Sequence, residues 1–125
     1  MAQVALVVDD SMLIRHTVCR FLEQRGFTVE SASNGVEALA TLSEMRADLI
    51  VTDLMMPKMT GSELITAVKS NPQTSAIPIV VLAGRQSASE VHPEGRADYV
   101  IFKDIDIVEQ LDRALASAKL LAVSN

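Results

Sequence analysis

Near its start the chain has the stretch VALVVDD (residues 4–10), a continuous apolar run that ends in two acidic residues. Two later apolar runs also end on a charged residue: LIVTD (residues 49–53) on an aspartate and YVIFK (residues 99–103) on a lysine. Continuous apolar runs of this length are typical of strands buried on both faces of a parallel sheet. In open α/β sheets the ligand site lies beyond the carboxyl ends of such strands. The four charged side chains expected to meet there are Asp9, Asp10, Asp53 and Lys103.

Strand-like runs alternate along the chain with helix-like patterns, and this alternation is the signature of a parallel α/β sheet. The second run has fewer β-branched residues than the others, so we expect it at an edge of the sheet. With 125 residues the chain has the size of one ordinary domain, and we expect a single domain over residues 1–125. The five expected strands cover residues 4–8, 27–32, 49–53, 77–82 and 99–102.

Capping residues mark where three of the helices are expected to begin. Ser11 precedes the first helix, Thr60 and Glu63 form a capping box for the third, and Asp106 precedes the last. Apolar residues at helical spacing follow each of these positions. Between the fourth and fifth strands, residues 84–97 contain a proline and two glycines, so a full helix is not expected there.

Composition excludes several classes of function. Hydrophobic residues make up 49% of the chain, which excludes a disordered tail. The net charge is −5 without a cluster of Lys and Arg, and aromatic residues are only 3%, so we expect no direct binding of nucleic acid. No apolar stretch approaches the roughly 20 residues that cross a bilayer, and we expect no membrane association. The single cysteine and the lack of a signal-peptide pattern lead us to expect a cytoplasmic protein.

Carboxylates gathered at one edge of a sheet repel one another unless a cation lies between them. Two of them about 4 Å apart repel by roughly 1 kcal/mol in water, and by about 4 kcal/mol at an effective dielectric constant of 20. Taken singly, Asp10 can cap a helix and Asp53 can end a strand, but together they indicate a cation site. Oxygen ligands favour a hard ion, and Mg²⁺ commonly takes one or two carboxylates together with phosphate oxygens. No His or Cys falls near these strand ends, so zinc is not expected.

The acidic pattern is similar to that of the receiver domain of two-component response regulators. Three motifs carry the resemblance in the family's order and spacing: Asp9-Asp10, DLMMPKMTG (residues 53–61) and Lys103. The likeness extends over essentially the whole chain. It implies a flavodoxin-like, doubly wound, five-stranded parallel sheet of order 2-1-3-4-5, and this order comes from the family and not from the residues. The fourth helix of that fold is then shortened or irregular here.

The resemblance also implies a role for each site residue. Asp53 takes a phosphoryl group from the phosphohistidine of a sensor histidine kinase or a phosphotransfer protein. Asp10, Asp53 and the backbone carbonyl of Met55 hold Mg²⁺, and Asp9 does so directly or through water. Lys103 pairs first with the Asp53 carboxylate and then with a phosphoryl oxygen. Such a domain passes its signal to a downstream protein partner and is not an enzyme that acts on an external substrate.

Some positions depart from the family's pattern. Receivers usually carry Thr or Ser at the end of the fourth strand, where this chain has Ala83, which offers no hydrogen-bond donor. A gapless alignment on Lys103 places Val100 where the family has a switch aromatic residue. Asp104 stands in place of the family's proline, so we expect a trans peptide bond there. We therefore expect Asp53 to be phosphorylated while the signal is read differently or weakly.

Three other functions compete with phosphoacceptance. A pseudo-receiver keeps the fold as a protein interaction module and takes no phosphate; Ala83 and Val100 favour it, and the intact acids oppose it. A phosphatase of the haloacid dehalogenase type needs a second acid two residues after the nucleophile, where this chain has Met55. A flavodoxin needs a phosphate loop rich in Ser, Thr or Gly after the first strand, where Asp9-Asp10 repel phosphate. The last two fit poorly.

Overall fold

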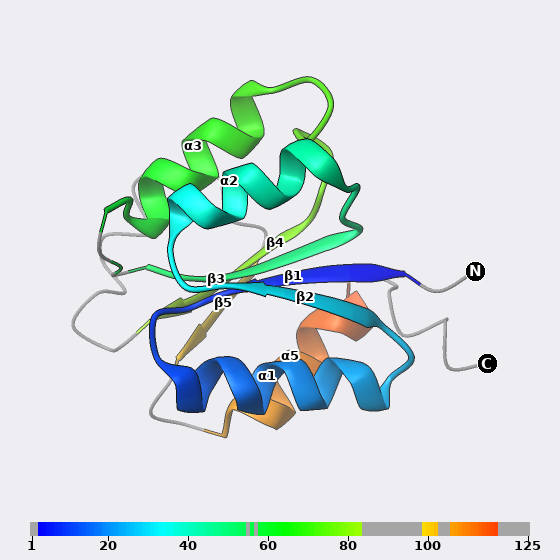
Figure 1. Ribbon diagram of the computed structural model, residues 1–125. Helices are drawn as coiled ribbons and strands as arrows, with labels where there is room; N and C mark the ends of the chain where they lie inside the picture. Colours follow the sequence, from blue (N-terminus) through cyan, green and yellow to red (C-terminus); the bar gives the residue numbers. More distant parts are fainter. Residues whose placement is uncertain (1–2, 55, 57, 84–98, 103–105, 118–125) are drawn as a thin grey trace.

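The computed structural model describes residues 3–54, 56, 58–83, 99–102 and 106–117. Strands and helices alternate along these residues (Figure 1). The strands are β1 (Val4–Val8), β2 (Thr28–Ala32), β3 (Leu49–Asp53), β4 (Ile79–Ala83) and β5 (Tyr99–Phe102). The helices are α1 (Met12–Gln24), α2 (Gly35–Glu44), α3 (Gly61–Ser70) and α5 (Ile107–Ser117).

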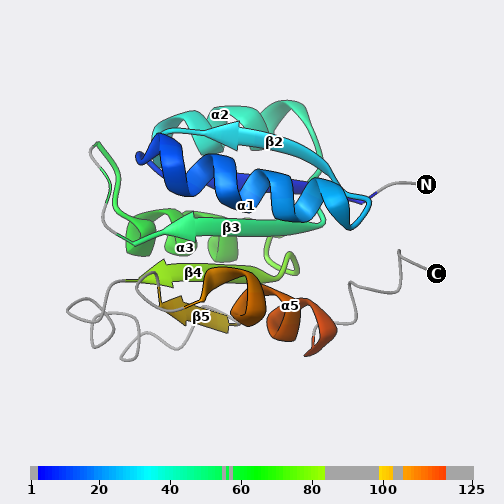
Figure 2. The same ribbon diagram turned by 90° about the horizontal axis from the view of Figure 1, so that it is seen from below.

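The five strands form one parallel sheet in the order β2-β1-β3-β4-β5, which confirms the predicted doubly wound fold. Helices α2 and α3 cover one face of the sheet, and α1 and α5 cover the other (Figures 1 and 2). The predicted edge position of the second strand is confirmed, because β2 stands at one end of the strand order, beside β1. The expected irregular fourth helix falls on residues 84–97, which lie outside the described part of the chain.

The strands β1, β3 and β4 are buried on both faces of the sheet, and this burial explains their continuous apolar runs. One apolar cluster lies between the sheet and helices α2 and α3, and a second lies between the sheet and helices α1 and α5. Alternate residues of β1, β3 and β4 enter alternate clusters. In β1, for example, Leu6 and Val8 belong to the first cluster, and Ala5 and Val7 belong to the second. The polar ends of these strands are therefore held by a packed core on either side.

The helices begin where their capping residues predict. Ser11 caps α1, Thr60 and Glu63 form a complete capping box at α3, and Asp106 accepts a backbone hydrogen bond at the start of α5. Asn34 is the N-cap of α2. Local hydrogen bonds of this kind depend on residues within one turn, which is why the sequence reveals them.

The fourth strand is shifted relative to its prediction. It covers Ile79–Ala83 and not residues 77–82. Pro78 has no N–H, so it contributes only its carbonyl, which accepts the N–H of Ile50 at 3.0 Å. Regular pairing then places Leu82 opposite Asp53, so that Ala83 lies one residue beyond the level of that aspartate. Among the described helices, none combines the length and the apolar character needed to span a membrane.

Candidate cation and phosphoryl site

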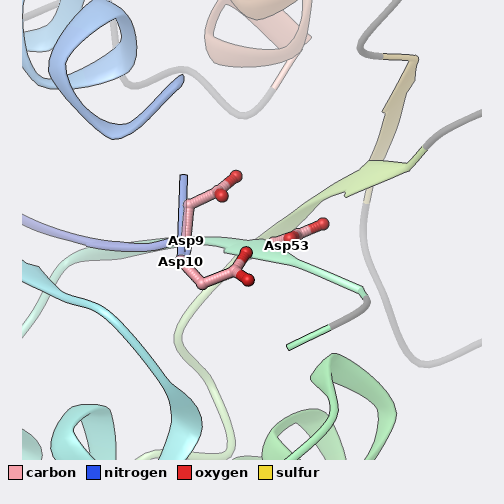
Figure 3. Close-up of side chains that lie close together, drawn as sticks. All are labelled: Asp9, Asp10 and Asp53. Atoms are coloured by element: carbon pink, nitrogen blue, oxygen red, sulfur yellow. The ribbon is translucent and has the colours of Figure 1, made fainter. Parts of the chain in front are cut away.

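Three carboxylates meet at the carboxyl edge of the sheet. The register pairs Val8 of β1 with Thr52 of β3, so the residues that follow, Asp9 and Asp53, lie at the same level. Asp10 extends from the turn after β1. One carboxylate oxygen from each of the three aspartates lies within 4.8 Å of the others (Figure 3). The structure thus brings together the three acids that the strand ends predicted.

The three side chains differ in their exposure to solvent. Asp9 is 0% exposed, Asp53 is 5% exposed, and Asp10 is exposed. Burial of a carboxylate is costly unless its charge and its hydrogen-bonding atoms are matched by the surroundings. Two of the acids are therefore buried in the protein, and the third is exposed to solvent.

The turn after β1 holds Asp9 through hydrogen bonds to three neighbours. Its N–H donates to the carbonyl of Ala32 in β2 at 3.1 Å, and its Oδ1 accepts the N–H of Ser11 at 2.8 Å. Its carbonyl accepts a hydrogen bond from Nη1 of Arg15 at 2.7 Å. The sequence prediction missed Arg15, because no local pattern shows that a side chain of α1 reaches back to the backbone before the helix.

Asp53 ends β3 at the point where the first residue of α3 packs against the strand. The N–H of Gly61 donates to the carbonyl of Leu54 at 2.7 Å. A Cβ atom on Gly61 would collide with the carbonyl oxygen of Asp53 and lie 2.7 Å from the Cα of Leu54. The last glycine of the DLMMPKMTG motif therefore allows α3 to begin against the peptide group of Asp53, and this contact fixes where that aspartate lies.

Two cations act on Glu37 in the first turn of α2. The backbone N–H of Ser33 donates to Oε1 of Glu37 at 3.0 Å. Hydrogen bonding to Ser33, and then the positive charges of Lys58 and Arg15, hold the pKa of Glu37 below its ordinary value. Arg15 thus contacts the turn that carries Asp9 and also influences the start of α2 by its charge.

The end of β4 carries no hydroxyl group beside the acids. Ala83 is fully buried and belongs to the apolar cluster under α2 and α3. In β5, Val100 is 38% exposed, whereas the neighbouring Ile101 is buried in the cluster under α1 and α5. The two departures seen in the sequence are therefore a buried methyl group and an exposed valine.

Two predicted site residues, Lys103 and Met55, lie outside the described residues, as does the peptide bond between Lys103 and Asp104. Their assigned roles, and the trans bond, stay predictions.

The chemistry of the three acids fits a hard divalent cation. Within the described part of the chain, the cluster able to hold a metal consists of Asp9, Asp10 and Asp53, so all of its ligand atoms are oxygens. Mg²⁺ and Ca²⁺ prefer such ligands, and Mg²⁺ is commonly held by few carboxylates together with water and phosphate oxygens. The donor set and its mutual repulsion both favour Mg²⁺ binding at this edge.

Comparisons of the sequence and of the structure with known proteins agree on one family. The sequence model of the family described as "Response regulator receiver domain" matches residues 5–115. The response regulator MprA of Mycobacterium ulcerans (strain Agy99) is 42% identical over 85 residues, which cover 68% of this chain and 36% of that protein. The chain therefore spans about a third of the length of this curated relative.

Solved structures of receiver domains match nearly the whole chain. The signal receiver domain of a signal transduction histidine kinase from Syntrophus aciditrophicus has a TM-score of 0.82 at 31% identity, covering 97% of this chain and 91% of that one. The chemotaxis response regulator CheY4 of Vibrio cholerae has a TM-score of 0.81 at 33% identity, covering 97% and 99%. The chain therefore belongs to the response regulator receiver domains, a family of signalling domains in two-component systems that generally accept a phosphoryl group.

Proposed function

We propose that this chain accepts a phosphoryl group on Asp53, with Mg²⁺, from the phosphohistidine of a sensor histidine kinase or a phosphotransfer protein. One observation carries the proposal: the carboxylates of Asp9, Asp10 and Asp53 lie within 4.8 Å of one another at the edge where receiver domains have their acidic site. The phosphorylated domain then signals to a downstream protein partner. We place it in the cytoplasm, where such partners and reduced thiols are found.

Asp53 is the proposed nucleophile. In the reaction, a carboxylate oxygen of Asp53 forms a bond to phosphorus while the bond from phosphorus to the histidine nitrogen breaks. The electron pair of that bond returns to the imidazole. Because a carboxylate is a weak nucleophile, the rate depends mainly on its placement and on neutralisation of charge. Burial of Asp53 at the end of β3, against α3, supplies the placement.

The other acids of the cluster are the proposed ligands of Mg²⁺. Asp9, Asp10 and Asp53 would hold the ion, and the carbonyl of Met55 is added by the resemblance to the family. When bound, Mg²⁺ supplies positive charge opposite the phosphoryl oxygens. Lys103, also assigned by resemblance, would add a second positive charge on the same side of the sheet.

Phosphorylation with a small phosphodonor tests the assignment of Asp53. The unsubstituted chain and two variants, Asp53→Asn and Asp48→Asn, are incubated with acetyl phosphate with and without Mg²⁺, and the mass of each is measured. Asp48 is a matched control, because it lies directly before β3, at the opposite edge, where its Oδ2 accepts the N–H of Val4 at 2.8 Å. We expect one phosphoryl group on the unsubstituted chain and on Asp48→Asn, only with Mg²⁺, and none on Asp53→Asn. Modification that persists in Asp53→Asn would remove Asp53 from this role.

A pseudo-receiver is the second candidate, and the buried methyl group of Ala83 favours it. A receiver without the hydroxyl at this position lacks one donor for the phosphoryl group, a loss of about 1.5–3 kcal/mol for a hydrogen bond to a charged group. Beryllofluoride with Mg²⁺, which imitates a phosphoryl group on an aspartate, separates the two candidates. Binding of beryllofluoride supports phosphoacceptance. A chain that binds neither beryllofluoride nor a phosphoryl group is an interaction module.

A further inference from the structure

We propose that Arg15 is a positioning residue for the cation site, which holds the turn after β1 so that Asp9 and Asp10 share one cation with Asp53. The inference rests on the proposed function, because it concerns Mg²⁺ at the same three acids. Affinity for the ion then depends on a basic residue that lies on α1 and does not itself act as a ligand.

Arg15 anchors the turn at two points. Its backbone N–H donates to the carbonyl of Ser11 at 3.0 Å, as the first turn of α1 requires. Its side chain extends back toward the end of β1, where Nη1 donates to the carbonyl of Asp9 at 2.7 Å. Asp10 lies between these two anchored residues. Because Asp10 is the exposed acid of the three, its distance from Asp53 depends on the shape of this short turn.

An arginine suits this task better than other side chains. The carbonyl of Asp9 comes directly after the last residue of β1, where the ladder to β3 ends. A donor must reach it from the first turn of α1, six residues further along the chain. A guanidinium group has a long stem and several donors in a fixed planar arrangement, whereas lysine offers one compact ammonium group. Arg15 is also half-buried, so its stem is held by neighbouring side chains.

The positive charge of Arg15 and its hydrogen bond to Asp9 have opposite effects on the affinity for Mg²⁺. A cation beside an acidic cluster weakens the binding of another cation, so loss of the charge alone tightens Mg²⁺ binding. Asp10 is exposed and Arg15 is only half-buried, so solvent screens this repulsion, and the effect amounts to about a factor of two in Kd. Loss of a group that orients a metal ligand instead weakens binding by about 10–100-fold. A rise in the Kd for Mg²⁺ after loss of Arg15 therefore indicates anchoring, and a fall indicates an effect of charge alone.

The experiment compares Arg15→Met, Arg15→Lys and the matched control Arg20→Met. Arg20 lies on the same helix, is exposed, and its replacement changes the net charge by the same amount. Isothermal titration calorimetry gives the Kd for Mg²⁺, and circular dichroism checks the fold. We expect Arg15→Met to raise the Kd about tenfold or more and Arg20→Met to change it less than twofold. Arg15→Lys keeps the charge and restores part of the affinity.

A second readout separates positioning from a loss of folded protein. The rate of phosphorylation by acetyl phosphate is measured over a range of Mg²⁺ concentrations. A positioning role shifts the Mg²⁺ concentration at half-maximal rate upward and leaves the rate at saturating Mg²⁺ within about twofold. A purely structural role lowers that maximal rate in proportion to the unfolded fraction.

The result that overturns the inference is a folded Arg15→Met whose Kd for Mg²⁺ equals that of Arg20→Met or is lower. If Arg15→Met does not fold, Arg15→Lys decides, and an unchanged Kd in that variant overturns the inference as well. Absence of Mg²⁺ binding by the unsubstituted chain contradicts the proposed function itself. The two failures are therefore distinguishable.

Discussion

At the scale of the residue, we expect Ala83 to set how long a phosphoryl group stays on Asp53. It is the last residue of β4, fully buried, and one position beyond the residue that pairs with Asp53. In Ala83→Thr the new hydroxyl is a donor for a phosphoryl oxygen. We expect the lifetime of phosphorylated Asp53 to lengthen about tenfold, in line with a charge-assisted hydrogen bond of about 1.5 kcal/mol. The lifetime is measured by mass spectrometry after removal of the phosphodonor.

The control for this prediction is Ala83→Val, which has nearly the same shape as threonine and no donor. Both variants enlarge a fully buried side chain, so both are expected to lose about 1–3 kcal/mol of stability. Equal lifetimes in the Thr and Val variants would show that the missing hydroxyl does not set the behaviour of the site.

At the scale of the element, the packing of the first residue of α3 fixes the position of the last residue of β3. Gly61 and Gly35 are both the first residue of a helix, but an added Cβ meets different atoms at the two positions. At Gly61 it meets the backbone of Asp53 and Leu54, and at Gly35 it meets the Cβ, Cγ and Sδ atoms of Met59. Backbone cannot move aside without displacing the strand. We expect Gly61→Ala to lower the free energy of unfolding by about 3 kcal/mol, and to weaken Mg²⁺ binding.

Gly35→Ala is the matched comparison for this element. There, a gain of up to about 1 kcal/mol in helix propensity partly offsets the displacement of Met59, whose Cβ cannot leave by a rotamer change alone. We therefore expect a smaller loss than at Gly61, about 1 kcal/mol. Urea denaturation of both variants gives the two free energies. Equal losses in the two variants would contradict the assignment of Gly61 as the contact that positions Asp53.

At the scale of the whole molecule, we expect repulsion among the three acids to lower the stability of the metal-free protein. The chain has a net charge of −5, and three of its carboxylates are gathered at one edge. Removing one charge in Asp10→Asn relieves a repulsion of about 1 kcal/mol. We therefore expect Asp10→Asn to unfold at a higher temperature than the unsubstituted chain in metal-free buffer, although it removes a proposed ligand.

The same variant is expected to lose its response to Mg²⁺. Binding to the folded state alone stabilises a protein by RT ln(1 + [L]/Kd), about 2.7 kcal/mol at a ligand concentration of 100 times Kd. The unsubstituted chain should thus gain thermal stability as Mg²⁺ is added, and Asp10→Asn should gain much less. Glu30→Gln on the exposed side of β2 removes the same charge elsewhere and serves as control. An equal rise in unfolding temperature with added Mg²⁺ for Asp10→Asn and Glu30→Gln would argue against a cation site at Asp10.

Much of the fold and part of the site follow from the sequence, because their causes are local. Apolar runs of four or five residues identify the buried strands, and the capping groups at Ser11 and Thr60 identify helix starts. Gly26 marks the end of α1 with a φ of 92°, a conformation that favours glycine. Charged residues at the strand ends identify the acids of the site. The order of the strands came from the resemblance to the family, since no local pattern contains it.

Only the tertiary structure decided how these residues meet. The register of β1 against β3 places Asp9 level with Asp53, and a shift of one residue would turn one of them to the other face. The return of Arg15 to the carbonyl of Asp9 and the packing of Gly61 on the end of β3 are likewise contacts between separate elements. The sequence by itself determined which residues are charged and at which strand ends they lie. Packing of the helices on the sheet determined the distances between those charges, because such contacts depend on side chains far apart in the chain.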